Sequence, residues 1–166
     1  MVIRILRRKI GNPVEVIGLI SDTHGLVRPE ALDALRGVDL IIHAGDIGKA
    51  VVLEALRPIA PLHAIKGNND RGAWAKKLPD TKTISIGGTR LFLIHHVNDL
   101  DFDLSERRVA VVISGHSHKP SIIDRDGVLF VNPGSAGPRR FKLPVAVGKL
   151  RIADGKVKAE IIELNI

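Results

Sequence analysis

Unbroken aliphatic runs alternate with short polar segments along this chain. The runs are Val14–Ile20, Leu40–Ile42, Leu62–Ile65, Leu91–Ile94 and Val109–Ile113. Continuous Val, Ile and Leu is typical of strands that are buried on both faces of a sheet. Between the first three runs, the pattern predicts two helices, over Pro29–Leu35 and over Lys49–Leu56. Strands that alternate with helices in this order predict a parallel sheet.

The second half of the chain predicts antiparallel hairpins instead. The three predicted strand pairs are Thr81–Ile86 with Thr89–Ile94, Ser121–Asp124 with Val128–Asn132, and Val145–Ile152 with Val157–Leu164. Gly87-Gly88 separates the first pair and is a strong two-residue hairpin signal. Segment 70–80 is expected to form a loop or a short helix, and segment 98–108 is expected to hold a short helix. Together, the two halves predict two sheets packed against each other with helices outside.

Length and composition are those of one globular domain. The 166 residues are 45% hydrophobic and 26% charged, and no linker divides them. We therefore expect a single domain over residues 1–166, in which residues 1–13 form a short basic arm or edge strand. The chain has no cysteine, and no stretch approaches the roughly 18 apolar residues of a membrane span. A cytoplasmic protein without a membrane partner is expected, and a homo-oligomer is compatible with the sequence.

The net charge favours a phosphorylated partner. Lys and Arg number 25 against 18 Asp and Glu, which gives +7, and the excess is spread along the chain. Such a field attracts phosphate groups. Aromatic residues make up only 3% of the chain and tyrosine is absent, which argues against a platform that stacks nucleic-acid bases. A small phosphoester is therefore the expected partner, and nucleic acid is not favoured.

Potential metal ligands follow nearly every aliphatic run. The five clusters are Asp22-Thr23-His24, Gly45-Asp46, Gly67-Asn68-Asn69-Asp70, His95-His96 and Gly115-His116-Ser117-His118. An open α/β sheet places its ligand crevice beyond the carboxyl ends of its strands. Carboxylate, amide and imidazole groups at these ends would converge on one spot. The sequence therefore predicts a metal site with enough ligands for two ions.

Each cluster by itself also has an ordinary explanation. Asp22 and His24 point to one side of an extended segment and could share a metal, but an N-cap aspartate beside a surface histidine gives the same pattern. Gly45-Asp46 and segment 67–70 are typical of turns. The two histidines of segment 115–118 favour a metal site over a loop. Independent turns give no reason for all the clusters to follow strands in order, so the joint pattern favours the metal site.

The order of these motifs resembles that of the calcineurin-like metallophosphoesterase superfamily. The series D-x-H, G-D, G-N-x-D, H and G-H-x-H is followed by Asn132-Pro133-Gly134-Ser135, and the match runs from about Val14 to about Arg139. Within the superfamily, the chain looks like the small single-domain phosphodiesterases of bacteria and archaea. The resemblance implies an α/β fold, a four-layer α/β/β/α sandwich with two mixed β-sheets.

The same resemblance implies a di-metal centre. It assigns Asp22, His24 and His118 to one metal, assigns Asn68, His95 and His116 to the other, and makes Asp46 the bridge. It further implies a phosphodiesterase in which a hydroxide that bridges two divalent ions attacks phosphorus and breaks a P–O bond. Mixed nitrogen and oxygen ligands favour transition metals over Mg²⁺ and Ca²⁺. Manganese is the first choice, with Fe, Co, Ni or Zn as alternatives.

Two residues depart from the superfamily's pattern. Asn69 stands where many members have a histidine thought to protonate the leaving group, and an amide cannot act as that acid at neutral pH. His96 stands where a glycine is usual. Its imidazole either substitutes for the missing acid or lines the wall of the site. Asn69 and His96 are thus the candidate residues for the catalytic step.

Other polar residues near the motifs have supporting assignments. His43 and His63 lie in predicted strands and are expected to be structural, His43 with a contact to Asp46. The segment 132–135 is expected to shape the floor of the site. Arg139 and Arg140 either contact substrate phosphate or form a solvated pair.

Two other functions fit the same motifs. A non-catalytic scaffold, of the kind represented by the small retromer subunit that shares this fold, would be expected to lose ligands, whereas every matched position here holds a competent one. A nuclease is the other alternative, motivated by the charge of +7. A salt-dependent affinity for DNA or RNA would favour it.

Overall fold

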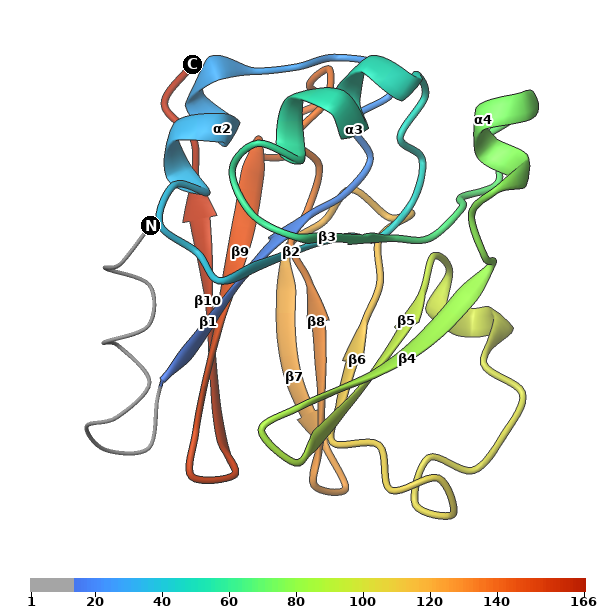
Figure 1. Cartoon of the computed structure of the whole chain (residues 1–166), viewed down its shortest axis with the longest axis vertical. Helices are drawn as coiled ribbons and strands as arrows, with labels where there is room; N and C mark the ends of the chain where they lie inside the picture. Colours follow the sequence, from blue (N-terminus) through green and yellow to red (C-terminus); the bar gives the residue numbers. More distant parts are fainter. Residues whose placement is uncertain (1–13) are drawn as a thin grey trace, which may run out of the picture.

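Two five-stranded β-sheets lie face to face in the computed structural model, which describes residues 14–166 (Figure 1). The expectation of an arm or edge strand at residues 1–13 falls outside the described residues. No helix in residues 14–166 combines the length and the apolar content that a membrane span needs.

The first sheet has a parallel half and an antiparallel half. From edge to edge, its strands are β10 (Lys156–Glu163), β9 (Ala146–Ala153), β1 (Glu15–Ile20), β2 (Leu40–His43) and β3 (Leu62–Ala64). β1, β2 and β3 run parallel, and their carboxyl ends are level because Ile20 pairs with His43 and His43 with Ala64. β9 runs antiparallel to both β1 and β10. The predicted parallel order of the early strands is confirmed.

The second sheet is built around two hairpins. From edge to edge, its strands are β4 (Thr81–Ile86), β5 (Thr89–Ile94), β6 (Val111–Ile113), β8 (Val128–Asn132) and β7 (Ser121–Arg125). β5, β6 and β8 run parallel, whereas β4 and β7 are antiparallel to their neighbours. Gly87 and Gly88 turn between β4 and β5 with φ values of 55° and 80°, as a two-residue type I′ turn requires. All three predicted hairpins are confirmed, and both sheets are mixed.

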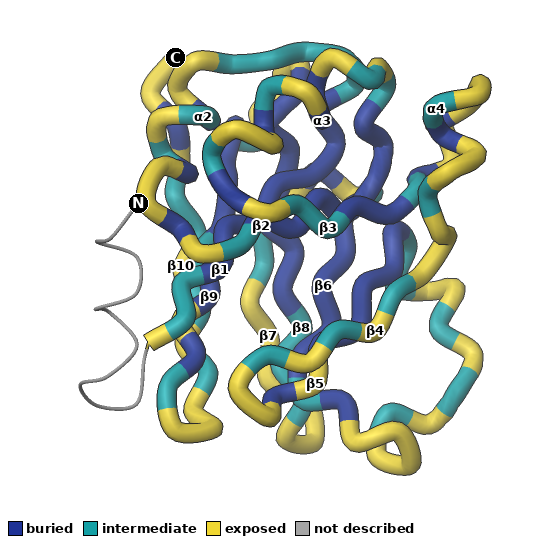
Figure 2. Tube along the Cα trace, viewed as in Figure 1, coloured by how far each residue is buried: buried dark blue, intermediate teal, exposed yellow. Residues whose placement is uncertain are grey.

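Alternate side chains of the central strands fill separate apolar layers. Leu19 of β1, Ile42 of β2 and Leu93 of β5 belong to the layer between the sheets. The other face of the first sheet packs against α2 (Pro29–Ala34) and α3 (Ala50–Leu56). Figure 2 shows the central strands of the sheets buried, whereas the edge strands β4 and β7 and the hairpin turns are largely exposed or half-buried. This alternation follows from the two-residue period of a strand, which sends successive side chains to opposite faces.

Segment 97–109 covers the outer face of the second sheet. Its Phe102 meets Phe92 of β5 edge-on, with ring centroids 4.8 Å apart, and Val112 packs in the same cluster. The helix expected over 98–108 is reduced to the 3-10 helix η1 (Val97–Asp99) at the start of this segment. The short helix expected within 70–80 is α4 (Ala73–Lys76). The predicted fold class, an α/β sandwich with two mixed sheets, is confirmed.

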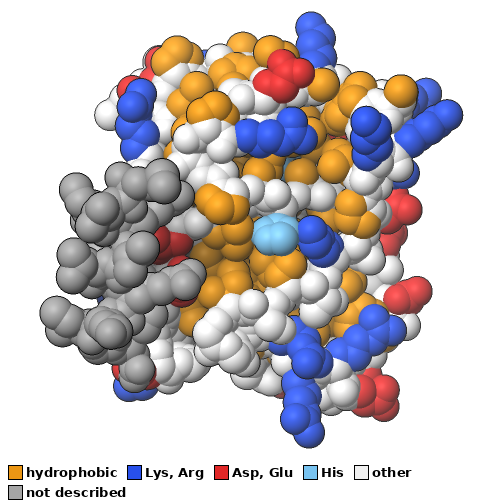
Figure 3. Space-filling model, in the orientation of Figure 1, with side chains coloured by type: hydrophobic (Ala, Val, Ile, Leu, Met, Phe, Trp, Pro, Cys, Tyr) orange, Lys and Arg blue, Asp and Glu red, His pale blue; other side chains and the backbone are white. Residues whose placement is uncertain are grey.

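Cationic side chains are distributed over the surface. Figure 3 shows Lys and Arg at several separate places on one face of the molecule, with apolar side chains between them. This distribution agrees with the even spread of positive charge along the sequence.

Candidate metal centre

The polar segments that follow the strands meet at one end of the sandwich. The backbone N–H of Asp22 donates to the carbonyl of Gly45 at 3.0 Å, which joins the segments after β1 and β2. The N–H of Gly115 donates to the carbonyl of His95 at 2.9 Å, which joins the segments after β6 and β5. The N–H of His116 donates to the carboxylate of Asp22 at 3.0 Å and connects the two sheets. The convergence expected from the sequence is present.

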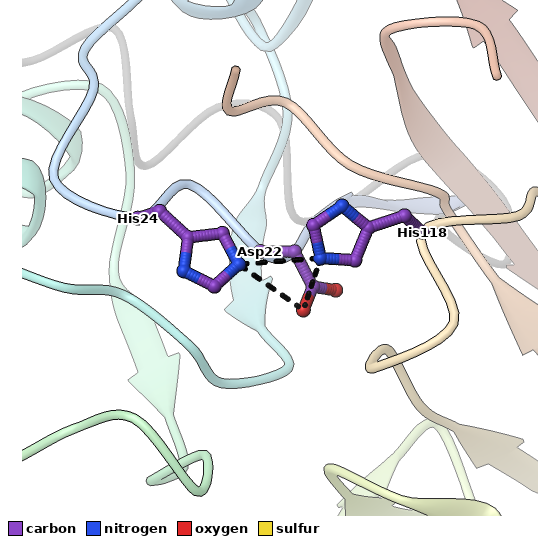
Figure 4. A group of neighbouring side chains, drawn as sticks. All are labelled: Asp22, His24 and His118. Carbon is purple, nitrogen blue, oxygen red and sulfur yellow. Dashed lines mark hydrogen bonds and ion pairs between the residues drawn. The ribbon is translucent and has the colours of Figure 1, made fainter. Parts of the chain in front are cut away.

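Asp22, His24 and His118 form a first group of potential metal ligands (Figure 4). Nε2 of His118 lies 3.4 Å from Oδ1 of Asp22, and Nε2 of His24 lies 4.0 Å from the same oxygen. The two Nε2 atoms are 3.2 Å apart. Donors bound about 2.0–2.2 Å from one ion are themselves about 3.0–3.5 Å apart, so the arrangement is close to that of a metal site.

A second group, Asp22, Asp46 and His95, shares Asp22 with the first. Nε2 of His95 lies 3.4 Å from Oδ2 of Asp46 and 3.9 Å from Oδ1 of Asp22. Oδ2 of Asp46 is also 3.9 Å from Nε2 of His24. Each carboxylate therefore faces histidines of both groups. The sequence placed Asp46 alone between the two sites, whereas the geometry makes Asp22 equally central.

Asn68 and His116 lie beside the second group. Oδ1 of Asn68 is 3.3 Å from Nδ1 of His116. The ring of His116 meets the ring of His95 edge-on, with centroids 5.3 Å apart. The structure thus brings all seven residues that the sequence nominated as ligands into one region. Five of them form the two groups that share Asp22, and Asn68 and His116 lie beside the second group.

Three buried polar atoms in this region lack hydrogen-bond partners. Within residues 14–166 they are Oδ1 of Asp22, Nε2 of His95 and Nδ1 of His118. Such atoms are rare in folded proteins because leaving them unpaired is costly. Oδ1 of Asp22 and Nε2 of His95 are among the atoms that face one another between the two groups. A cation there would satisfy both, so the residues present fit a metal site.

Hydrogen bonds behind the ligands fix their orientation. Nδ1 of His95 lies 2.7 Å from the carbonyl oxygen of Ala44, so Nδ1 carries the proton and Nε2 is free to bind a metal. Oδ2 of Asp22 accepts hydrogen bonds from the hydroxyl of Ser21 at 2.7 Å and from the backbone N–H of His116 at 3.0 Å. Oδ1 of Asp22 is therefore the oxygen left for a cation.

The two candidate catalytic residues have different surroundings. Asn69 donates twice to Asp46, from its backbone N–H to Oδ1 and from its Nδ2 to Oδ2, both at 2.9 Å. Its side chain thus holds the Asp46 carboxylate. His96 instead stacks on the ring of His116, with centroids 4.0 Å apart and an angle of 28° between the rings.

Five of the candidate ligands adopt strained backbone conformations. Asp22, His24, Asp46, His116 and His118 have φ values between 47° and 71°, in the left-handed region. Residues other than glycine seldom occupy this region, and each instance costs about 1–3 kcal/mol. Such strain clusters at functional sites. Here it turns the chain sharply beyond the strand ends, so that neighbouring side chains reach a common point.

Two motif glycines let the backbone pass close to the carboxylates. A Cβ atom at Gly67 would clash with Oδ1 of Asp46, and one at Gly115 would lie 2.6 Å from Oδ2 of Asp22. Only glycine avoids these overlaps. The glycines of the sequence motifs are thus explained by contact with the ligand side chains.

Burial and neighbouring charges set the protonation of the ligands. Burial raises the pKa of Asp22 to about 6. Burial also acts to raise the pKa of Asp46, but its interactions with His95 and with Asn69 shift it below the usual value. Burial, together with the charge of Arg140, lowers the pKa of His118 to about 4. His118 is therefore neutral near neutral pH, which is the form of imidazole that binds metals.

Asp70 supports the site without an assignment from sequence reasoning. Its buried carboxylate accepts hydrogen bonds from the backbone N–H groups of Gly48 at 2.8 Å and Gly67 at 2.9 Å. These bonds tie together the segments that carry Asp46 and Asn68. In the sequence, Asp70 is marked only as the last residue of the G-N-x-D motif, and an aspartate at such a position is also typical of an ordinary turn.

His43 is structural, as expected, but with other partners. Its Nε2 lies 3.0 Å from the hydroxyl of Thr23, and its Nδ1 accepts from the N–H of Gly45 at 3.2 Å. Burial lowers the pKa of His43 to about 3, so the ring is neutral. The expected contact with Asp46 is replaced by these bonds to the two loops around it.

A cavity of about 840 Å³ opens beside the second ligand group. Asn68, His95, His96 and His116 contribute to its lining. Phe102 also lines it, with the guanidinium of Arg107 3.8 Å from the centre of the ring. The volume suits a small organic ligand.

Comparisons with known proteins agree with this geometry. A family model described as the calcineurin-like phosphoesterase superfamily domain matches residues 16–155. A probable metallophosphoesterase of Methanothermobacter thermautotrophicus is 38% identical over 159 residues, which cover 89% of this chain and 91% of that protein. A phosphodiesterase of Methanocaldococcus jannaschii is 29% identical over 137 residues, which cover 71% of this chain and 82% of that protein.

Solved structures share the architecture. A protein described as a novel archaeal phosphodiesterase has a TM-score of 0.73 and 25% identity, with 89% of this chain and 99% of that chain covered. A single mutant of Vps29 from Entamoeba histolytica has a TM-score of 0.70 and 25% identity, with 90% and 99% covered. The resemblance noted in the sequence, and the hydrolase class that it implies, are confirmed. Because the family model matches most of this chain, from residue 16 to residue 155, the chain belongs to the calcineurin-like phosphoesterase superfamily.

Proposed function

We propose that this protein is a phosphodiesterase that uses two divalent transition-metal ions. The observation that supports this most is the pair Asp22 and Asp46, whose carboxylates each face histidines of both ligand groups. Shared carboxylates suit two ions about 3.5–4 Å apart, the spacing of two-metal hydrolases. Manganese is the first choice, with Fe, Co, Ni or Zn as alternatives, because the donors mix imidazole nitrogen with carboxylate and amide oxygen.

The ligand sets that we propose are those implied by the sequence motifs. One ion would be held by Asp22, His24 and His118, the other by Asn68, His95 and His116, with Asp46 shared. When bound, the ions would polarise the phosphoryl group and lower the pKa of the attacking water. The chain's own contribution is to hold these donors in place through the hydrogen bonds behind them.

The surroundings of the centre favour diesters over monoesters. Asn69 is bonded to Asp46, and its amide has no acidic proton to give a leaving group. We propose His96 for that task, because its imidazole lies outside the ligand groups and lines the adjacent cavity. The cavity of about 840 Å³ has room for one ester arm. Esters with good leaving groups would depend least on such an acid.

A non-catalytic scaffold is the second candidate, because Vps29 shares the fold. A scaffold would not need the ligand residues. The full ligand set is present here, and three of its buried atoms lack a hydrogen-bond partner within residues 14–166, which favours the enzyme. The nuclease alternative, the cytoplasmic location and a homo-oligomer stay predictions.

Hydrolysis by the purified protein tests the proposal. We expect bis-p-nitrophenyl phosphate to be hydrolysed when manganese is supplied and not after chelation, and faster than glycerol phosphate, an alkyl monoester. Faster turnover of the monoester would contradict the diesterase proposal. If a folded protein hydrolyses neither ester with any of the metals named, the scaffold becomes the better explanation.

A further inference from the structure

An aromatic ring stands almost fully in solvent on the connection between β8 and β9. Residues 138–142, Pro-Arg-Arg-Phe-Lys, are all exposed and are called the basic loop below. Phe141 is 88% exposed and has a φ of 52°. A bulky residue in the left-handed region costs about 1–3 kcal/mol. A ring that is this exposed returns little of that cost through burial, so packing does not explain the conformation.

Hydrogen bonds anchor the start of the basic loop at the metal centre. The N–H of Gly137 donates to Oγ of Ser135 at 3.1 Å, and this hydroxyl donates to the backbone carbonyl of Asp22 at 2.9 Å. Nη2 of Arg28 donates to the carbonyl of Gly137 at 3.1 Å. On the other side of the loop, the N–H of Leu143 donates to the carbonyl of Arg140 at 3.1 Å and closes the turn. The loop is therefore held beside the first ligand group.

The cations of the basic loop have no partner among the residues that the structure describes. The side chains of Arg139, Arg140 and Lys142 make no hydrogen bond or ion pair with residues 14–166. Three cations without a partner in residues 14–166 and one exposed ring thus belong to a loop that is held beside a site suited to a phosphodiester.

This combination matches one chemical class of ligand. Guanidinium and ammonium groups bind phosphate oxygens, and an exposed aromatic ring stacks on a planar base. We propose that the basic loop holds the nucleotide arm of a phosphodiester substrate, with a base on Phe141 and a neighbouring phosphate on Arg139, Arg140 and Lys142. Cleavage of the bound ester rests on the proposed phosphodiesterase function. Binding of the nucleotide arm to the loop does not require hydrolysis.

The number of aromatic side chains in the loop indicates how many bases it can bind. Phe141 is the single aromatic residue of the loop, so the loop has a place for one base. The low aromatic content of the chain, 3%, still excludes an extended stacking platform. A short nucleotide diester fits better than a long strand. An aromatic residue among cations also suits an anionic membrane surface, but the anchoring of the loop at the metal centre favours the nucleotide.

A binding experiment in chelator, where no hydrolysis occurs, tests the assignment directly. The probe is a short fluorescein-labelled oligothymidylate, followed by anisotropy at several salt concentrations. We expect Phe141→Ala to weaken binding about 5- to 150-fold, and Phe141→Trp to preserve it, as one stacked base predicts. Arg139→Gln and Arg140→Gln should each reduce the salt slope by about 0.7. Lys156→Gln, at the exposed first residue of β10 and at the far end of the first sheet, is the matched control and should change neither quantity.

Three results would overturn the assignment: no binding by the wild type, binding unaffected by Phe141→Ala, or Phe141-dependent binding to phosphatidylserine vesicles without binding to the oligonucleotide. A kinetic measurement adds a second readout on the metal-loaded protein. Phe141→Ala should raise the KM for thymidine p-nitrophenyl phosphate and leave the KM for methyl p-nitrophenyl phosphate unchanged. Equal effects on both esters would contradict the assignment. If the wild type hydrolyses neither ester, the proposed function fails, and the binding experiment still decides this inference.

Discussion

Nδ2 of Asn69 donates a 2.9 Å hydrogen bond to Oδ2 of Asp46, the same oxygen that lies 3.4 Å from Nε2 of His95. A residue that stands in place of a superfamily histidine thus orients a carboxylate between two ligand groups. The backbone N–H of Asn69 donates to the other oxygen, so one residue holds both ends of the carboxylate. Asn69 therefore has a role in this chain, the orientation of the Asp46 carboxylate, for which its side chain does not need to be an acid.

Asn69→Ala should weaken metal binding without unfolding the protein. Loss of the Nδ2 bond frees the Asp46 carboxylate to rotate, and removal of such an orienting partner typically costs about 10- to 100-fold in metal affinity. Titration calorimetry with manganese measures the change. Asn98→Ala, an exposed asparagine in η1, is the matched control. An affinity for Asn69→Ala equal to that of the control would show that Asp46 does not need this bond.

Asp46→Asn should weaken both metal sites, whereas Asn68→Ala should weaken mainly one. Oδ2 of Asp46 lies within 3.9 Å of a histidine of each group, but Asn68 contacts only His116 among the predicted ligands. Metal analysis of the purified, metal-supplied protein gives the number of ions per chain, and the wild type should reach two. A wild-type value that never exceeds one ion would end the di-metal proposal.

Asp22→Asn should stabilise the metal-free protein above about pH 6. Burial raises the pKa of Asp22 from 3.8 to about 6, so the folded state binds this proton more tightly than the unfolded state. Stability therefore falls as the pH rises through this window, by about 3 kcal/mol in all. Asparagine does not titrate, and its oxygen can still accept from Ser21 and from the N–H of His116.

Urea unfolding in chelator measures this gain at two pH values. The variant should be more stable than the wild type near neutral pH. It should show no advantage near about pH 4, which is close to the ordinary pKa of aspartate. With manganese present, the order should reverse, because only the wild type binds the ion with full affinity. A gain of equal size at both pH values would mean that the charge of Asp22 is not its source.

His96→Gly should lower the rate on poor leaving groups far more than on p-nitrophenolate. A positioned general acid contributes roughly 10²- to 10⁴-fold, and p-nitrophenolate departs without help. His96 lines the cavity next to His116, where an ester arm would lie. The comparison needs one good and one poor leaving group of similar size. Equal or higher rates on both, with the largest gain for bulky esters, would instead make His96 part of the cavity wall.

The sequence by itself determined the strands and the candidate ligand residues. Aliphatic runs such as 14–20 and 91–94 carry the signal of a buried strand locally, and the hairpin at Gly87-Gly88 follows from the backbone freedom of two glycines. The ligand clusters were found because each lies directly after a strand, so their common location depends only on the parallel direction of neighbouring strands. The strands, the hairpin turn and the positions of the ligand clusters depend on neighbouring residues in the sequence, so local sequence patterns predict them.

Only the tertiary structure decided which atoms these residues present to one another. The central place of Asp22, the bond from Asn69 to Asp46 and the bracing by Asp70 join residues that lie far apart in the chain or in separate loops. The helix expected over 98–108 is replaced by one 3-10 turn, because Phe102 packs on the second sheet instead of following a helical period. Side-chain direction at a strand end depends on the register of the strands around it, and local periodicity carries no information about that register.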